Sequence, residues 1–191
     1  MRRALIVLLL LGCLAPSARA QHAPATLAEL VESAGTILVG RVLKVREEPH
    51  PQYPFLTITR VTLAVERAFK GSLEGDSFTF LQIGGSKTFR PFHLPSYREG
   101  EEVMLFLYPK SRYGLTSPVA GMAGKFRLFR DPQTKRRMAV NGFDNRGLFD
   151  DSSARLALSS AERALVSRHE HGPIEYEVLA ALIARGANAS R

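Results

Sequence analysis

Alternation of apolar and polar residues is clearest near the middle of the chain and predicts β-strands. Between residues 57 and 69, Val61, Leu63 and Val65 alternate with polar side chains, a period of two that is typical of a half-buried strand. Residues 103–108 are apolar at every position, which predicts a central place in a sheet. Shorter apolar or β-branched runs predict further strands at residues 37–46, 78–83, 115–120, 125–130 and 138–140.

The two ends of the chain carry a helical pattern instead. Thr26-Leu27-Ala28-Glu29 is a capping box, and it predicts a short helix that ends at Gly35. Residues 159–168 predict a second capped helix, and Pro173 predicts the start of a third that ends before Gly186. The apolar stripe of the third helix consists of Ile174, Val178, Leu182 and Ile183.

Glycine and proline separate the predicted strands. Gly40 interrupts residues 37–46, which predicts a bulge or a close backbone approach. Pro49 to Pro54 is a rigid loop, and residues 84–98 form a long polar connection. Several short strands with glycine-rich turns predict a mainly β fold, a small barrel or sandwich, with helices packed on it from both ends.

The order of several short motifs between Ala34 and Val140 resembles a group of exported, mostly uncharacterised bacterial proteins. Their core is similar to the OB-type barrel of netrin modules and tissue inhibitors of metalloproteinases. The motifs are Ile37-Leu38-Val39-Gly40-Arg41-Val42, Phe69-Lys70-Gly71, Gly84-Gly85, Gly100-Glu101-Glu102-Val103-Met104-Leu105-Phe106-Leu107 and Val119-Ala120-Gly121-Met122-Ala123-Gly124-Lys125-Phe126-Arg127-Leu128.

This resemblance implies a small OB-like, TIMP/netrin-like antiparallel barrel whose open face or loops bind a ligand. It implies no activity, because a fold does not carry a function with it. The animal inhibitors chelate zinc through an amino-terminal cysteine held by disulfides. The mature chain is expected to begin at Gln21 and to hold no cysteine, so that mechanism does not transfer, whereas blocking a protease with loops stays open.

The first twenty residues predict export from a bacterial cell. Met1-Arg2-Arg3 is a basic start, Ala4 to Leu14 is apolar, and Ala18-Arg19-Ala20 is a small-residue cleavage site. Cleavage after Ala20 predicts a periplasmic or secreted protein. In the alternative interpretation Leu10-Leu11-Gly12-Cys13 is a lipoprotein box, and acylated Cys13 tethers the chain to the outer membrane. No later segment is apolar for long enough to span a bilayer.

Length and charge fit one exported domain. The 191 residues, 45% of them hydrophobic, suffice for a single core. We expect a signal peptide at residues 1–20, an OB-like domain with its amino-terminal helix at 21–150, and a helical tail at 151–191. The net charge of +8 falls to +5 when Arg2, Arg3 and Arg19 leave with the signal peptide, a mild excess that favours anionic partners.

The sequence holds no recognisable catalytic or cofactor motif. Cys13 is the only cysteine, so the mature chain has neither disulfides nor thiol chemistry. Gly121 to Lys125 lacks the spacing of a phosphate loop, and Ser86 stands in no nucleophile elbow. We therefore expect no enzyme activity and no cofactor. His169 and His171 are weak candidates for metal ligands, but two histidines, with Glu175 as a conceivable third ligand, do not define a site.

Basic residues near the predicted 125–140 hairpin form a second candidate site. Lys125 and Arg127 share one strand face, and Lys135, Arg136 and Arg137 follow the hairpin turn. Such a patch could hold a phosphate, an anionic glycan or an acidic protein. It lacks the interleaved exposed aromatic residues on which OB-folds stack bases, so nucleic acid is not expected as a partner. The alternative interpretation is a charged edge that prevents strand-to-strand aggregation.

Three hypotheses for function follow from these patterns. The favoured one is an exported, non-enzymatic binding module that engages or inhibits another exported protein, such as a protease, through its loops. The second is an envelope structural or assembly lipoprotein tethered through Cys13, and the third is a hydrolase with an unrecognised site. The candidate binding residues lie in two proline-containing loops: Tyr53, Phe55, Arg90, Phe92, His93 and Tyr97.

Overall fold

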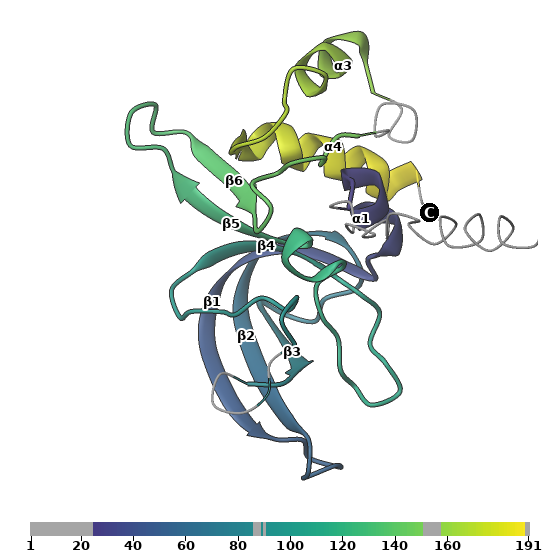
Figure 1. Cartoon of the computed structure of the whole chain (residues 1–191), viewed down its shortest axis with the longest axis vertical. Coiled ribbons are helices and arrows are strands. Elements are labelled where there is room, and N and C mark those ends of the chain that lie inside the picture. The colour runs from purple at the N-terminus through teal and green to yellow at the C-terminus, as the bar shows by residue number, and fades with distance from the viewer. Residues whose placement is uncertain (1–24, 86–88, 90, 151–157, 190–191) are drawn as a thin grey trace, which may run out of the picture.

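A single antiparallel sheet organises the chain, as a computed structural model shows (Figure 1). The structure describes residues 25–85, 89, 91–150 and 158–189. The predicted signal peptide, Cys13, Ser86 and Arg90 lie outside the described residues. Within them the sheet has seven strands: β1 (Thr36–Pro49), β2 (Thr57–Lys70), β3 (Ser77–Ile83), β4 (Glu102–Leu107), β5 (Lys125–Arg130), β6 (Arg137–Asn141) and β7 (Ile174–Glu175).

The strand order is β3-β2-β1-β4-β5-β6-β7, and every neighbouring pair is antiparallel. The mainly β fold is thereby confirmed, and the sheet is not closed. Two isolated bridges beside it involve the segment that follows β4: Leu115 pairs in parallel with Leu81 of β3, and Pro118 pairs with Leu107 of β4. Residues 115–118 therefore connect Leu81 of β3 with Leu107 of β4, but they do not form the regular strand expected at 115–120.

Strands β1 and β4 carry apolar side chains on both faces because each face has its own core. Ile37 and Val39 of β1 pack with Phe106 of β4 in one buried cluster, together with the helices. Leu38 of β1 and Leu105 of β4 pack in the second cluster, inside the curved β1–β3 half. The period of two explains this division, and β4 is central, as its sequence predicts. Gly40 lies at a register shift against β2, so the expected bulge is confirmed.

Three α-helices lie on one side of the sheet within the described residues, and the last of them packs against β2, β6 and β7. They are α1 (Leu27–Ser33), α3 (Ser160–Val166) and α4 (Tyr176–Ala189), beside a short 3-10 turn, η2 (Gly121–Ala123). Both predicted capping boxes are present, at Thr26 and at Ser159. The prediction for the last helix is wrong at both ends. Ile174 belongs to β7, which pairs with β6, and α4 continues past Gly186, because the tertiary contacts of a helix outweigh the weak propensity of one glycine.

No helix in the described part of the chain is both long and apolar enough to cross a bilayer.

Candidate functional site

An apolar pocket of about 470 Å³ lies where the loop before β4 meets the connection between β4 and β5. This volume falls within the range of small-ligand and side-chain pockets. The polar groups among its lining residues are His93, Tyr108 and Ser117, and the rest of the wall is apolar. The lining consists of Ala25, His93, Leu94, Tyr108, Ser117, Pro118, Ala120, Gly121, Ala123 and Phe143. We call it the β4–β5 pocket.

The wall of the pocket depends on a glycine in the left-handed region. Gly121 has a φ of +62°, and a Cβ on it would lie 2.1 Å from the carbonyl oxygen of His93. The neighbouring amide of Met122 donates a hydrogen bond of 3.1 Å to that same oxygen. Ala120 also lies in the left-handed region, with a φ of +49°, a conformation that is costly for a residue with a Cβ. The turn is therefore held in shape by its contact with the loop at His93.

Two aromatic side chains are exposed at the pocket. Tyr108 is 42% exposed and Phe143 is 39% exposed, and the hydroxyl oxygen of Tyr108 accepts a hydrogen bond from the Ala120 amide at 3.4 Å. Phe92, directly before His93, is 95% exposed. Apolar surface concentrated at a concave site is typical of a binding surface.

The two loops predicted to bind a partner have different neighbours in the structure. Tyr53 packs on Phe55 and Tyr113 at the end of the β1–β2 hairpin, whereas His93 lines the β4–β5 pocket. Tyr97 is buried, 7% exposed, and its ring packs edge-on against Phe80 in the second core. Burial raises the pKa of Tyr97 well above its ordinary value. Tyr97 therefore supports the core and presents little surface to a partner.

Carboxylates divide the predicted basic patch. Lys125 is largely buried and donates to both carboxylate oxygens of Glu101 at 2.8 Å, and burial lowers its pKa. Arg136 pairs with Glu175. Arg127 is exposed, and its guanidinium carbon lies 4.6 Å from the ring centroid of Phe129.

Lys135, the fourth member of that patch, lies in the turn between β5 and β6 and donates to the carbonyl oxygen of Pro132 at 2.7 Å. The fifth member, Arg137, is the centre of an ion-pair network described next. Three of the five predicted residues thus pair with carboxylates, which offset part of the positive charge at this hairpin.

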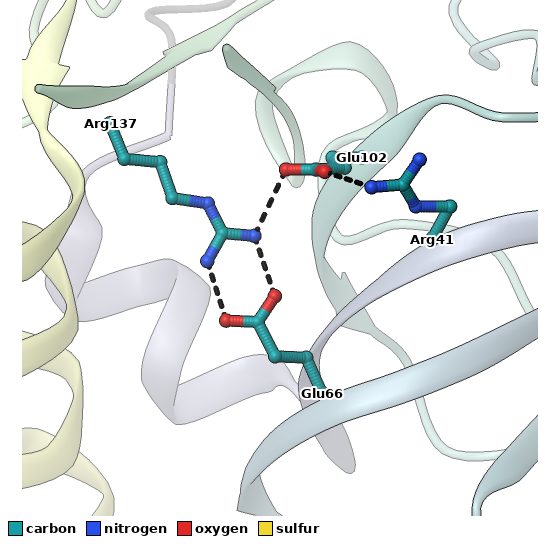
Figure 2. Close-up of polar contacts among 4 residues, drawn as sticks. All are labelled: Arg41, Glu66, Glu102 and Arg137. Carbon is teal, nitrogen blue, oxygen red and sulfur yellow. Dashed lines mark hydrogen bonds and ion pairs between the residues drawn. The ribbon is translucent and has the colours of Figure 1, made fainter. Parts of the chain in front are cut away.

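A network of four charged residues joins β1, β2, β4 and β6 (Figure 2). The guanidinium of Arg137 donates to both carboxylate oxygens of Glu66, at 2.5 and 2.7 Å, and to Glu102 at 3.2 Å. Glu102 in turn accepts a bond of 2.6 Å from Arg41. Two cations and two carboxylates balance, so the network is suited to holding strands together and leaves little net charge for a ligand.

The surroundings of Arg137 strengthen this structural role. Its guanidinium carbon lies 4.5 Å from the ring centroid of Tyr176, at the start of α4. The hydrogen bond from Arg137 lowers the pKa of the Glu66 carboxyl, and the same bond raises the pKa of Arg137. Arg137, the first residue of β6, thus contacts both β2 and α4 through its side chain.

The two candidate metal ligands, His169 and His171, have different contacts in the structure. His171 pairs through Nδ1 with Asp144 at 3.2 Å, whereas the ring of His169 packs edge-on against Phe149, and burial lowers the pKa of His169. Glu175, the conceivable third ligand, pairs with Arg136. Among the described residues no group of three or more His, Cys, Asp or Glu side chains is placed to hold a metal ion.

Most of the β4–β5 pocket is not predictable from the sequence patterns. They place Tyr108 at the end of a strand and indicate no role for Phe143. The available signal was weak: Phe143 follows Gly142 directly, and Tyr108 opens a connection that contains Gly114, Gly121 and Gly124. Comparison of the chain with protein-family models gives no match, and no curated protein matches it either.

Proposed function

We propose that the chain is an exported, non-enzymatic binding module that engages another exported protein through the β4–β5 pocket and the adjoining Phe92. The exposed aromatic residues around this concave apolar site support the proposal. A partner side chain inserted there would be shielded from water on several sides, the condition under which interface contacts contribute most. A secreted protease is one such partner, in keeping with the resemblance to tissue inhibitors of metalloproteinases.

An OB-like barrel is part of the same proposal. Its support is the pair of isolated bridges of residues 115–118, parallel to β3 and antiparallel to β4. Strands β3, β2, β1 and β4 are neighbours in the sheet, and the two bridges attach residues 115–118 to the first and the last of them. These segments lie around the second core, which contains Phe80, Tyr97 and Leu105. An OB-fold is a five-stranded, partly open barrel that uses its loops for binding.

The test is capture of partners from native secretome and periplasm by residues 21–191, followed by mass spectrometry. Phe92→Ser and Phe143→Ser remove exposed aromatic surface at the pocket, and Phe55→Ser is the matched control because Phe55 is 81% exposed in a different loop. Loss of a hot-spot aromatic weakens binding about 30-fold. We expect one partner that the wild type and Phe55→Ser retain and the two pocket variants lose.

Two results would contradict this assignment. A partner that Phe55→Ser loses and the pocket variants retain would place the protein-binding site in the β1–β2 loop. Absence of any specific partner, with all variants folded by circular dichroism, would contradict the binding-module hypothesis itself.

A further inference from the structure

The β1–β2 hairpin ends far from the helices (Figure 1). The aromatic side chains at this end belong to neither core. We call this surface, residues 50–56 and 109–114, the aromatic tip. Phe55 is 81% exposed and Tyr113 is 36% exposed. Tyr53 lies between them, with ring centroids 6.1 Å from Phe55 and 5.2 Å from Tyr113. Exposed aromatic side chains at the end of a projecting hairpin are typical of a surface that contacts a membrane or another protein.

A buried histidine holds the aromatic tip in this shape. His50 is 3% exposed, and its Nδ1 accepts hydrogen bonds from the backbone amides of Gln52 and Tyr53, each 3.2 Å long. Nδ1 therefore carries no proton, and Nε2 donates to the carbonyl oxygen of Tyr113 at 2.9 Å. This one side chain joins the two loops of the tip. A preorganised loop loses little conformational entropy when it binds.

The charges on the aromatic tip are all positive. Residues 49–57 contain no Asp or Glu, and residues 108–116 contain Lys110 and Arg112 but no Asp or Glu. The Arg112 guanidinium lies 4.7 Å from the Tyr113 ring centroid and donates to its hydroxyl at 2.5 Å. The carboxylate of Glu48, close by in sequence, is occupied by Arg60 at 2.6 Å. The tip thus combines exposed aromatic rings with cations that complement an anionic surface.

We propose that the aromatic tip docks on the surface of an anionic lipid bilayer, with Phe55 inserted into the interfacial layer and Lys110 and Arg112 beside the lipid phosphates. Aromatic side chains favour the membrane–water interface, and each nearby cation adds attraction to an anionic leaflet. A bilayer needs no concave counterpart, which suits a projecting tip, whereas the concave surface described above lies at the β4–β5 pocket. This contact requires no spanning helix and no acylated cysteine.

The absence of tryptophan from the whole chain permits a direct test. Phe55→Trp introduces a single indole at the tip, and its fluorescence is recorded while vesicles containing phosphatidylglycerol and phosphatidylcholine are added. We expect emission to move to shorter wavelength as the indole leaves water, with weaker binding to vesicles of phosphatidylcholine alone. Adding Lys110→Gln and Arg112→Gln is expected to weaken binding to the anionic vesicles about fivefold for each cation.

Phe92→Trp is the matched control, because Phe92 is 95% exposed and lies beside the β4–β5 pocket. Its emission is expected to stay constant with vesicles, as is that of Phe55→Trp with inorganic phosphate alone. The proposal is overturned if Phe55→Trp shows no shift with anionic vesicles, if Phe92→Trp shifts equally, or if the charge variants bind as tightly as their parent. A shift produced by an exported protein but not by vesicles would assign the tip to a protein partner instead. None of these results depends on the partner-capture experiment, so the two proposals can fail separately.

Discussion

Gly121→Ala is expected to lower the free energy of unfolding by about 3 kcal/mol and to open the β4–β5 pocket. A left-handed φ costs a residue with a Cβ about 1–2 kcal/mol, and displacing packed atoms costs a further 1–3 kcal/mol or so. Both costs apply at Gly121, where φ is +62° and the new Cβ would meet the carbonyl oxygen of His93 at 2.1 Å. That oxygen must move away, and the hydrogen bond from Met122 is lost with it. Urea denaturation measures the difference.

Gly114→Ala separates the two causes. Gly114 has a φ of +71°, and a Cβ on it would meet nothing within 4 Å. This variant therefore carries the backbone cost alone, and we expect a loss of about 1 kcal/mol. It should also retain any partner that depends on the β4–β5 pocket, whereas Gly121→Ala should not. Equal losses of stability for the two variants would show that the turn is not pressed against the loop at His93.

Arg137→Met is expected to lower the free energy of unfolding by about 2 kcal/mol at neutral pH. Methionine retains much of the apolar contact with Tyr176, but it removes the paired bonds to Glu66 and the bond to Glu102. One hydrogen bond to a charged group contributes about 1.5–3 kcal/mol, but we expect only about 2 kcal/mol for the whole set because Glu66 is 51% exposed, so water screens the pair and hydrates the carboxylate that remains. The control is Arg41→Met, whose side chain is 59% exposed and should cost under about 1 kcal/mol.

The cost of Arg137→Met should depend on pH. The hydrogen bond from Arg137 lowers the pKa of Glu66 in the folded state, so the ionised carboxylate stabilises the fold above the ordinary glutamate pKa. That contribution is lost as the pH falls through the lowered value in the folded protein. The difference in stability between wild type and Arg137→Met should therefore shrink below about pH 4. A difference that stays constant from pH 7 to pH 3 would mean that Arg137 acts through packing alone.

Local patterns were sufficient wherever the physical cause was local. A capping box acts between residues three apart, so Thr26 with Glu29 and Ser159 with Glu162 identified helix starts that the structure confirms. Alternation along residues 57–69 identified β2, and the uniformly apolar run after Glu102 identified β4 as a central strand. Gly40 marked the bulge because a Cβ there would lie 2.3 Å from the carbonyl oxygen of Ala64, an approach that only glycine permits.

Contacts between distant segments could not be read in the same way. Arg137 and Glu66 are 71 residues apart, so the sequence showed a basic run where the structure has an ion-pair network. Tyr97 resembled a loop residue available to a partner, yet it is buried against Phe80. The β4–β5 pocket combines His93, Tyr108 and Phe143, which no sequence spacing connects.

The sequence by itself determined the mainly β fold, the helix caps and the central strand, because propensity, periodicity and turn chemistry act over a few residues. Only the tertiary structure decided which cations are neutralised, which aromatic rings are buried and where a pocket forms. Strand pairing fixes those features, since it brings residues far apart in the chain to within a few ångströms of one another, and their charge and burial follow from what they meet there.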